Sequence, residues 1–435
     1  MTLSPKLLAR APFLRNVAVL ASGTAVAQVL TILAYPILMR LFSPAQFGLF
    51  ALFGAIVMTV TVVAGLRYEL AIVIARTETE AANLLALAMT MTLVMAAASG
   101  LAFALGGDAL MAAFGTERLG WLLALLPVSI FAFGSYSVLS FWATRQQYYS
   151  RLSVSNVCRS VGVAAAQIGL GLARTGAAGL IVGQILGQLF AVGTLLGQIL
   201  KRDWRRIRPQ LSWREMRRAA WVHREFPIYN APAGLLNSTT ITVPSILLAT
   251  LFGAGVAGLY WFAYRLLEMP MTLLGDATRR VFYQRATELS HSNRELGDLF
   301  VRTSGALGLL AAVPSAVLLV AGPWLFEIVF GAAWREAGAY MQWLVVWWFL
   351  RFASLPATML VPLLGLQRVF LVLEVVTLVP RLLVFPVAAV YADAYAAIAA
   401  YSLVGVAFHA VAMLVVWRSV RLNDARLRGA QPAPA

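Results

Sequence analysis

Ionisable side chains fall inside several apolar stretches long enough to cross a bilayer, where charge is costly and therefore indicates function. The candidates that we select are Arg265, Glu268, Arg351, Glu374 and Arg381. A guanidinium is planar, stays charged and matches two phosphate oxygens, so arginines in such positions predict an anion-binding site. Arg351 is the foremost candidate because no acidic residue lies near it in the sequence.

The other four residues form two pairs. Arg265 and Glu268 are three apart and therefore share a helix face, where Arg265 would meet a diphosphate and Glu268 would tune it or exchange a proton. Glu374 and Arg381 are seven apart, two turns along one face, and are interpreted as lining a cavity. Neutralised pairs that hold helices together are the structural alternative, and the sequence leaves both roles open.

A further arginine and glutamate, Arg67 and Glu69, follow the apolar stretch 46–66. We interpret them as part of an inner gate or entry site, although snorkelling of Arg67 to the lipid surface explains that residue almost equally well. Three tryptophans of one stretch, Trp343, Trp347 and Trp348, would be able to stack on sugar rings. Tryptophans also populate membrane interfaces, and this second interpretation is favoured.

Neither a metal site nor a cofactor is expected. The single cysteine, Cys158, excludes an intramolecular disulfide, and the histidines, His223, His291 and His409, lie far apart without ligand spacing. His409 falls in an apolar stretch and is interpreted as a packing residue rather than a proton carrier. No catalytic residue and no nucleotide-binding motif is identified.

Composition predicts the elements that hold these residues. The chain is 61% hydrophobic and 12% charged, with mean hydropathy +0.80, whereas soluble proteins carry about 25% charged residues. Apolar stretches of about twenty residues match the bilayer core, and only helices satisfy the backbone there. Twelve spans are predicted at residues 16–39, 46–66, 81–105, 120–142, 154–173, 177–200, 226–252, 256–275, 303–326, 337–362, 369–391 and 394–417.

Charge distribution orients these spans. The net charge is +16, but the basic residues lie between apolar stretches and form no nucleic-acid-binding domain. With the N-terminus in the cytoplasm, only four of the 34 Lys and Arg occupy external loops, namely Arg40, Arg118, Arg174 and Arg335. This bias obeys the positive-inside rule. It predicts an uncleaved first span and two cytoplasmic termini.

A basic segment divides the chain almost in half. We expect a six-helix bundle at 1–200, a cytoplasmic linker at 201–225, a second bundle at 226–417 and a cytoplasmic tail at 418–435. Ser212 and Glu215 have the spacing of a capping box, and the helix that follows would place Trp213, Met216 and Trp221 on one face. We interpret it as an amphipathic helix on the anionic inner leaflet, with a plain charged linker as the alternative.

The two halves repeat each other. Residues 41–50 align with residues 251–260 in the first external turn of each half, and Phe114-Gly115 corresponds to Phe330-Gly331 in the second external loop. Such repeats place a transport site at their interface, so two bundles around a central cavity are expected. Gly183 and Gly187, at GxxxG spacing, predict close helix packing.

Residues 39–50, with the segment 66–84 that contains Arg67 and Glu69, resemble bacterial polysaccharide flippases of the multidrug/oligosaccharidyl-lipid/polysaccharide superfamily. Residues 281–286 and 330–334 are similar to further landmarks of these O-antigen and exopolysaccharide transporters. The resemblance implies an inner-membrane protein that moves an undecaprenyl-diphosphate-linked oligosaccharide to the periplasmic leaflet by alternating access. It also implies membrane lipids, and a polysaccharide polymerase and other assembly proteins, as partners.

Two other functions are weighed against this one. A multidrug or cation antiporter of the same superfamily would need an acid-lined cavity, whereas the intramembrane charges here are balanced. A membrane polymerase or ligase would need a large external loop, and every predicted external loop is short. The protein is therefore expected to be a transporter and not an enzyme.

Overall fold

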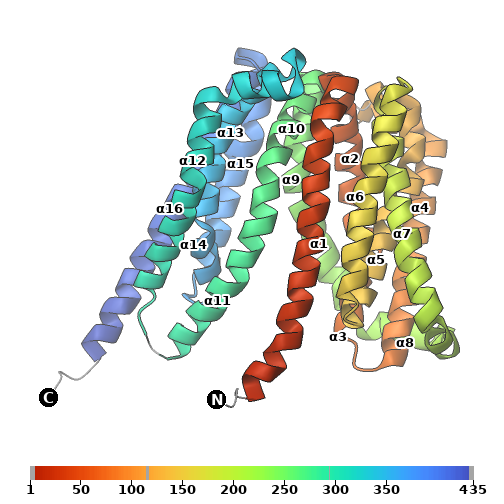
Figure 1. Ribbon diagram of the computed structural model, residues 1–435, viewed down its shortest axis with the longest axis horizontal. Helices are drawn as coiled ribbons and strands as arrows, with labels where there is room; N and C mark the ends of the chain where they lie inside the picture. Colours follow the sequence, from red (N-terminus) through yellow and green to blue (C-terminus); the bar gives the residue numbers. More distant parts are fainter. Residues whose placement is uncertain (1–4, 114–116, 293, 431–435) are drawn as a thin grey trace. The chain divides into compact units, whose positions relative to one another are not determined.

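The computed structural model describes residues 5–113, 117–292 and 294–430, and every regular element in these ranges is a helix (Figure 1). The chain forms two compact units, Met1–Thr250 and Leu251–Ala435. The predicted all-helical class is confirmed. Phe114 and Gly115, one half of the second predicted repeat match, lie outside the described residues.

The first unit is built from long helices with short elements between them. Its elements are α1 (Pro5–Leu41), α2 (Pro44–Ala64), α3 (Tyr68–Ile74), α4 (Glu78–Ala113), η1 (Glu117–Leu125), α5 (Leu126–Arg145), α6 (Tyr149–Leu172), α7 (Ala177–Ile207), η2 (Arg208–Gln210), α8 (Trp213–Val222), η3 (Phe226–Asn230) and α9 (Ala231–Leu251). The predicted close packing of α6 and α7 is confirmed, because a Cβ on Gly187 would lie 2.5 Å from the backbone nitrogen of Val163.

The second unit contains the remaining helices. They are α10 (Ala254–Pro270), η4 (Met271–Gly275), α11 (Asp276–His291), α12 (Gly297–Phe330), η5 (Ala332–Trp334), α13 (Arg335–Ala353), α14 (Leu355–Leu360), α15 (Gln367–Tyr391) and α16 (Ala394–Ala430). Phe262 of α10 anchors one end of this unit, with its ring centroid 4.8 Å from that of Phe330 and 5.1 Å from that of Trp334. These edge-to-face contacts join α10, α12 and η5 around a buried aromatic core.

The first external turn of each sequence repeat is stabilised by different residues. Ser43 and Gln46 form a capping box at the start of α2, where each side chain bonds the other's backbone amide, and Pro44 occupies the first helical turn. Before α10 the chain turns at Gly253 instead, whose φ of 97° is readily adopted by glycine. Similar positions in the repeat therefore do not require similar side chains.

The predicted capping box at Ser212 is wrong. Ser212 precedes α8, but its side chain makes no capping bond. Instead its backbone amide donates to Asn83 Oδ1 of α4 at 3.0 Å, and Asn83 Nδ2 donates to the carbonyl of Gln210 at 2.8 Å. A side chain from another helix thus replaces the local cap.

The predicted apolar face of α8 is divided in the structure. Met216 and Ala219 pack against the first unit's core, whereas Trp213 and Trp221 are exposed, at 76% and 67%. Tyr68 of α3 donates to the backbone carbonyl of Ala220 at 3.2 Å, and Glu80 of α4 contacts His223 at 2.7 Å. The buried face of α8 is therefore held against the first unit by packing and hydrogen bonds.

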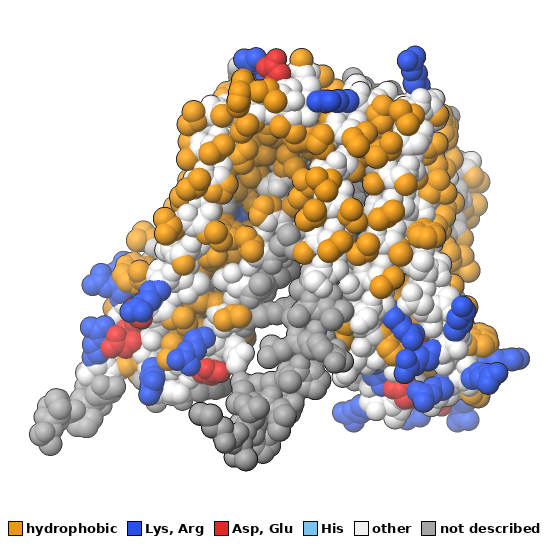
Figure 2. All heavy atoms as spheres, viewed as in Figure 1, with side chains coloured by type: hydrophobic (Ala, Val, Ile, Leu, Met, Phe, Trp, Pro, Cys, Tyr) orange, Lys and Arg blue, Asp and Glu red, His pale blue; other side chains and the backbone are white. Residues whose placement is uncertain are grey.

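Exposed apolar side chains cover the long helices of both units, which identifies a multi-pass membrane protein. Leu105 of α4 is 80% exposed, and Leu309 and Val320 of α12 are 76% and 82% exposed. Figure 2 shows hydrophobic side chains spread over each unit, with most of the visible Lys and Arg at one end and a few at the other. A continuous exposed surface of this kind is stable in lipid rather than in water.

Eight helices of the described chain are long and apolar enough to span a membrane, or nine if the bent pair Phe226–Thr239 and Ile241–Leu251 forms one span. The other three predicted spans correspond to α6, α10 and α13. Of these α10 has only 17 residues, and α6 and α13 carry arginines. The count of twelve and the six-plus-six division remain predictions; α9 lies almost entirely in the first compact unit.

Candidate functional site

The second unit holds an arginine whose guanidinium rests on tryptophan rings. Arg351 lies in the last turn of α13, three and four residues after Trp348 and Trp347, so all three share one helix face. The guanidinium carbon is 4.3 Å from the Trp348 ring centroid and 6.0 Å from that of Trp347, within cation–π range. Both rings are buried. They stabilise the cation without using its hydrogen-bond donors.

The nearest acid to Arg351 is Glu268 of α10. Arg351 Nη1 and Glu268 Oε2 are 3.9 Å apart, an ion pair too long for a hydrogen bond. Glu268 Oε2 is buried and has no hydrogen-bond partner among the described residues. The tertiary structure therefore gives Arg351 an acid that the sequence did not reveal, and the hydroxyl of Tyr264 in α10 hydrogen-bonds the same guanidinium.

A second arginine reaches the same tryptophan from α15. The Arg381 guanidinium carbon is 6.0 Å from the Trp347 centroid and 5.0 Å from that of Phe408 in α16. Its Nε is buried without a hydrogen-bond partner in the described chain. A buried charged donor without a partner is costly, so Arg381 is poised for an anionic ligand or for water.

More free donors surround the two arginines. The indole nitrogens of Trp343, Trp347 and Trp348 are buried and have no hydrogen-bond acceptor within the described residues. Tyr401 and Tyr264 pack edge-on against Trp347 and Trp348, with centroids 5.3 and 5.6 Å apart. Unsatisfied donors predominate in this cluster, which is the pattern expected of an anion site.

Two predicted members of the site lie elsewhere. Arg265 is exposed and makes no ion pair with Glu268 in the described structure, because the acid faces Arg351 of α13 instead. Glu374 is also exposed. The structure thus brings Arg351, Glu268 and Arg381 together, whereas Arg265 and Glu374 make no ion pair with them among the described residues. His409 bonds Ser354 Oγ at 2.9 Å, which agrees with a packing role.

In the first unit, Arg67 and Glu69 surround a strained turn. Leu66 and Arg67 both adopt left-handed conformations, with φ of 49° and 63°, at a cost of about 1–2 kcal/mol each. Arg67 Nη1 lies 4.0 Å from Glu69 Oε1, and Glu69 is only 4% exposed. Burial raises the pKa of the Glu69 carboxyl, while its backbone hydrogen bond and Arg67 lower it in part. The two predicted residues are therefore close together.

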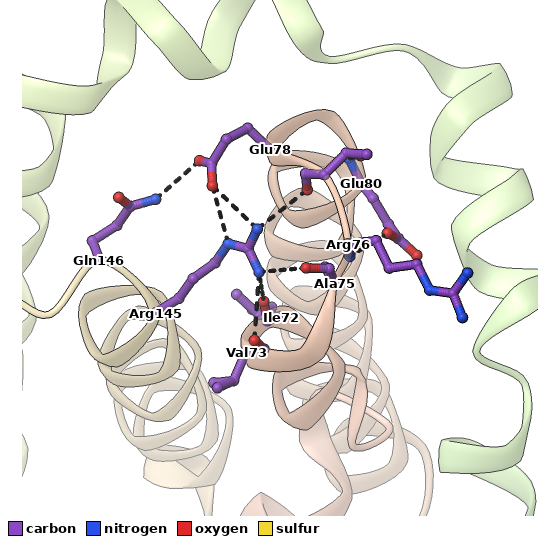
Figure 3. Close-up of polar contacts among 9 residues, drawn as sticks. Ile72, Val73, Ala75, Arg76, Glu78, Glu80, Arg145 and Gln146 are labelled. Atoms are coloured by element: carbon purple, nitrogen blue, oxygen red, sulfur yellow. Dashed lines mark hydrogen bonds and ion pairs between the residues drawn. The ribbon is translucent and has the colours of Figure 1, made fainter. Parts of the chain in front are cut away.

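Arg145 of α5 holds the far end of α3, as Figure 3 shows. Its Nη1 donates to the carbonyls of Ile72, Val73 and Ala75 at 3.0, 3.4 and 2.7 Å, which are orphan acceptors at a helix C-terminus. Its Nε and Nη2 contact Glu78 Oε1 at 3.3 and 3.1 Å. In the sequence Arg145 is one of the many basic residues outside the four external positions, and no further role was predicted for it. Its position just after the predicted span 120–142 is the only sequence signal for the contacts that it makes.

Most of this chain matches a known protein family. Residues 37–339 match the family described as "Polysaccharide biosynthesis protein". The amylovoran biosynthesis protein AmsL of Erwinia amylovora is 21% identical over 127 residues, which cover 29% of this chain and 33% of that protein.

Solved structures share the fold. The lipid II flippase MurJ in its inward closed conformation superposes with a TM-score of 0.69 and 9% identity, covering 94% of this chain and 90% of its own. A multidrug resistance MATE family transporter of the MOP superfamily, inward-facing, gives 0.67 and 14% identity, covering 93% and 96%. At these identities the likeness concerns the fold alone.

Proposed function

Since this chain belongs to the polysaccharide biosynthesis protein family, we propose that it translocates a lipid-linked oligosaccharide across the bacterial inner membrane. The cargo would be carried on undecaprenyl diphosphate and would pass from the cytoplasmic to the periplasmic leaflet by alternating access, for surface polysaccharide biosynthesis. The two six-helix halves would move around a central cavity, with both chain termini in the cytoplasm.

One observation carries the proposal, the pair of arginines Arg351 and Arg381 supported by aromatic rings. A diphosphate offers several anionic oxygens, and the guanidinium fork binds such oxygens two at a time. Ring support keeps the cations in the apolar interior without an acid that neutralises them tightly. The site therefore favours an anion over a cationic drug.

Each remaining residue has a defined role in this proposal. Glu268, at 3.9 Å from Arg351, would hold the guanidinium in place until phosphate displaces it, because the long ion pair is weak. The rings of Trp347 and Trp348 are occupied by guanidiniums, so their role would be to support arginines rather than to stack on sugars. Arg67 and Glu69 would act at the inner gate, where the strained turn before α3 would respond to conformational change.

A multidrug or cation antiporter is the second candidate, and one feature favours it. Glu69 is a buried carboxyl with an unpartnered Oε2, the kind of group that binds cations or protons. The two functions differ in the residues they need. A glycan flippase depends on Arg351, whereas a drug antiporter depends on the carboxylates.

A deletion strain tests the proposal. Without this protein, surface polysaccharide is expected to be lost and its lipid-linked precursor to accumulate on the cytoplasmic side. Re-expression of the wild-type chain should restore export, whereas the Arg351→Ala variant should not, at equal protein level. Normal polysaccharide with increased drug sensitivity in the deletion strain would instead support the antiporter. A polymerase or ligase would leave the precursor on the periplasmic side.

A further inference from the structure

The linker helix α8 carries a cavity that the proposed transport does not use. This α8 groove has a volume of about 620 Å³ and lies on the exposed side of the helix. Its lining consists of Arg214, Arg217, Arg218, Ala220, Trp221 and Arg224. Four guanidiniums around one open cavity favour an anionic occupant, because an anion relieves the repulsion between them.

Little in the described chain neutralises these arginines. Arg218 Nη1 lies 3.8 Å from Glu215 Oε2, and Arg224 stacks over the Trp221 ring at 4.3 Å. No acid is paired with Arg214 or Arg217 within the described residues. The surrounding segment 201–224 holds nine Lys and Arg against two acidic residues. The electrostatic field of the α8 groove is therefore strongly positive.

The α8 groove is held in shape from behind. Met216 and Ala219 pack into the core of the first unit, and Ala220 accepts a hydrogen bond from Tyr68 at 3.2 Å. Asn83 fixes the start of the helix through Ser212, at 3.0 Å. Because these contacts fix the backbone of α8, its arginines lose little further backbone entropy when a ligand binds.

Apolar side chains beside the arginines indicate a lipid rather than a soluble anion. Trp213 and Trp221 are 76% and 67% exposed, and Val222 is 53% exposed. Tryptophan favours the membrane–water interface, and arginine beside it favours anionic headgroups. A free phosphate would leave these rings in water.

From this combination we propose that the α8 groove binds the phosphodiester headgroup of an anionic phospholipid of the inner leaflet. The guanidiniums hold the phosphate oxygens by paired N–H donors, and the indoles lie against the glycerol and upper acyl chains. This site is separate from the arginines of the second unit and does not depend on which cargo the protein moves.

The test is lipid binding by the full-length protein in detergent, measured by native mass spectrometry during titration with phosphatidylglycerol. The triple variant Arg214→Gln, Arg217→Gln and Arg224→Gln should weaken the tightest phosphatidylglycerol site at least about tenfold, because each lost charge-assisted contact is substantial. Binding of zwitterionic phosphatidylcholine should not change. A variant that retains wild-type affinity for phosphatidylglycerol overturns the proposal.

A matched variant distinguishes lipid binding in the α8 groove from attraction by the positive charge of the whole segment. Lys201→Gln, Arg205→Gln and Arg208→Gln remove three exposed cations of the same segment that do not line the groove. They should weaken binding by less than about twofold, since long-range surface charge is screened. Equal losses in the two triple variants would contradict a defined site.

Two further measurements guard against misfolding of the glutamine variant and identify the ligand. The first replaces the same three arginines by lysine, which keeps the charge but lacks the paired donors. Affinity for phosphatidylglycerol should then fall about threefold, and unchanged affinity would contradict recognition by the guanidinium fork. Undecaprenyl diphosphate added in competition should not displace phosphatidylglycerol from the α8 groove. Its displacement would assign the groove to the cargo instead.

Discussion

Two partly buried arginines in this protein have different surroundings. Arg145 of the first unit donates to three carbonyls at the end of α3 and contacts Glu78, so its donors have acceptors within the fold. Arg351 of the second unit rests on Trp348 and faces Glu268 only at 3.9 Å. The guanidinium of Arg145 is held by backbone carbonyls and a close carboxylate, whereas that of Arg351 is held by aromatic rings, a long ion pair and the hydroxyl of Tyr264.

The difference distinguishes a structural arginine from a ligand-binding one. A guanidinium with all its acceptors supplied gains nothing from an added anion, whereas removing it leaves several carbonyls without donors. Contacts with aromatic ring faces stabilise the charge of a guanidinium without using its N–H donors. Stability should therefore depend on Arg145, and binding on Arg351 and Arg381.

The largest effect is expected from Arg145→Ala. Loss of this guanidinium leaves the carbonyls of Ile72, Val73 and Ala75 without their donor, and the free energy of unfolding should fall by about 3 kcal/mol. Unfolding of the purified protein by SDS titration measures this change. Arg76→Ala, at an exposed position nearby, should change stability by less than about 0.5 kcal/mol. Equal stability of the two variants would show that the α3 contacts are dispensable.

Arg351→Ala should give the converse result. Affinity for undecaprenyl diphosphate is expected to fall about 30-fold, roughly 2 kcal/mol, because charge-assisted hydrogen bonds to the anion are lost. The unfolding free energy should change by less than about 1 kcal/mol. Arg265→Ala is the control, since Arg265 is exposed and lies apart from the cluster. A loss of stability as large as that of Arg145→Ala would abolish the distinction between the two arginines.

Removal of the aromatic support should have a smaller effect. Trp348→Leu keeps an apolar side chain but removes the ring under Arg351, which is worth about 1 kcal/mol, so undecaprenyl diphosphate should bind about fivefold more weakly. In the Arg351→Ala background the same substitution should add almost nothing, because the two residues act together. Additive losses in this double-mutant cycle would mean that Trp348 contacts the ligand by itself.

The smallest effect concerns Glu69 and the pH dependence of stability. Its pKa is raised by burial, so the folded protein holds this proton more tightly than the unfolded chain. Stability is then highest below the ordinary carboxyl pKa and falls as the pH rises through the raised value. Glu69→Gln should flatten this fall and raise the unfolding free energy at neutral pH by no more than about 1 kcal/mol.

Unfolding measured across pH 4–8 tests this prediction. Exposed Glu225→Gln should leave the pH profile unchanged. A Glu69→Gln profile identical to that of the wild-type protein would show that Glu69 keeps an ordinary carboxyl pKa.

Some of the residues selected from the sequence lie together in the structure, and their binding role stays a prediction. Arg351 and Arg381 were selected as intramembrane cations, and the structure places both beside Trp347. The pairing of Glu268 was mistaken, since spacing along one helix suggested Arg265, while the structure brings Glu268 to α13. Helical spacing identifies residues on one face but not which neighbouring helix that face meets.

The family and the class of the protein were determined by the sequence alone. The match over residues 37–339 confirms the resemblance carried by residues 39–50 and 66–84, and apolar stretches about twenty residues long predicted a helical membrane protein because the bilayer offers the backbone no other partner. The sequence separates Arg351, inside a predicted span, from Arg145, which follows one. Only the tertiary structure decided which groups surround them, because the carbonyls that accept from Arg145 and the carboxylate that faces Arg351 come from helices distant along the chain.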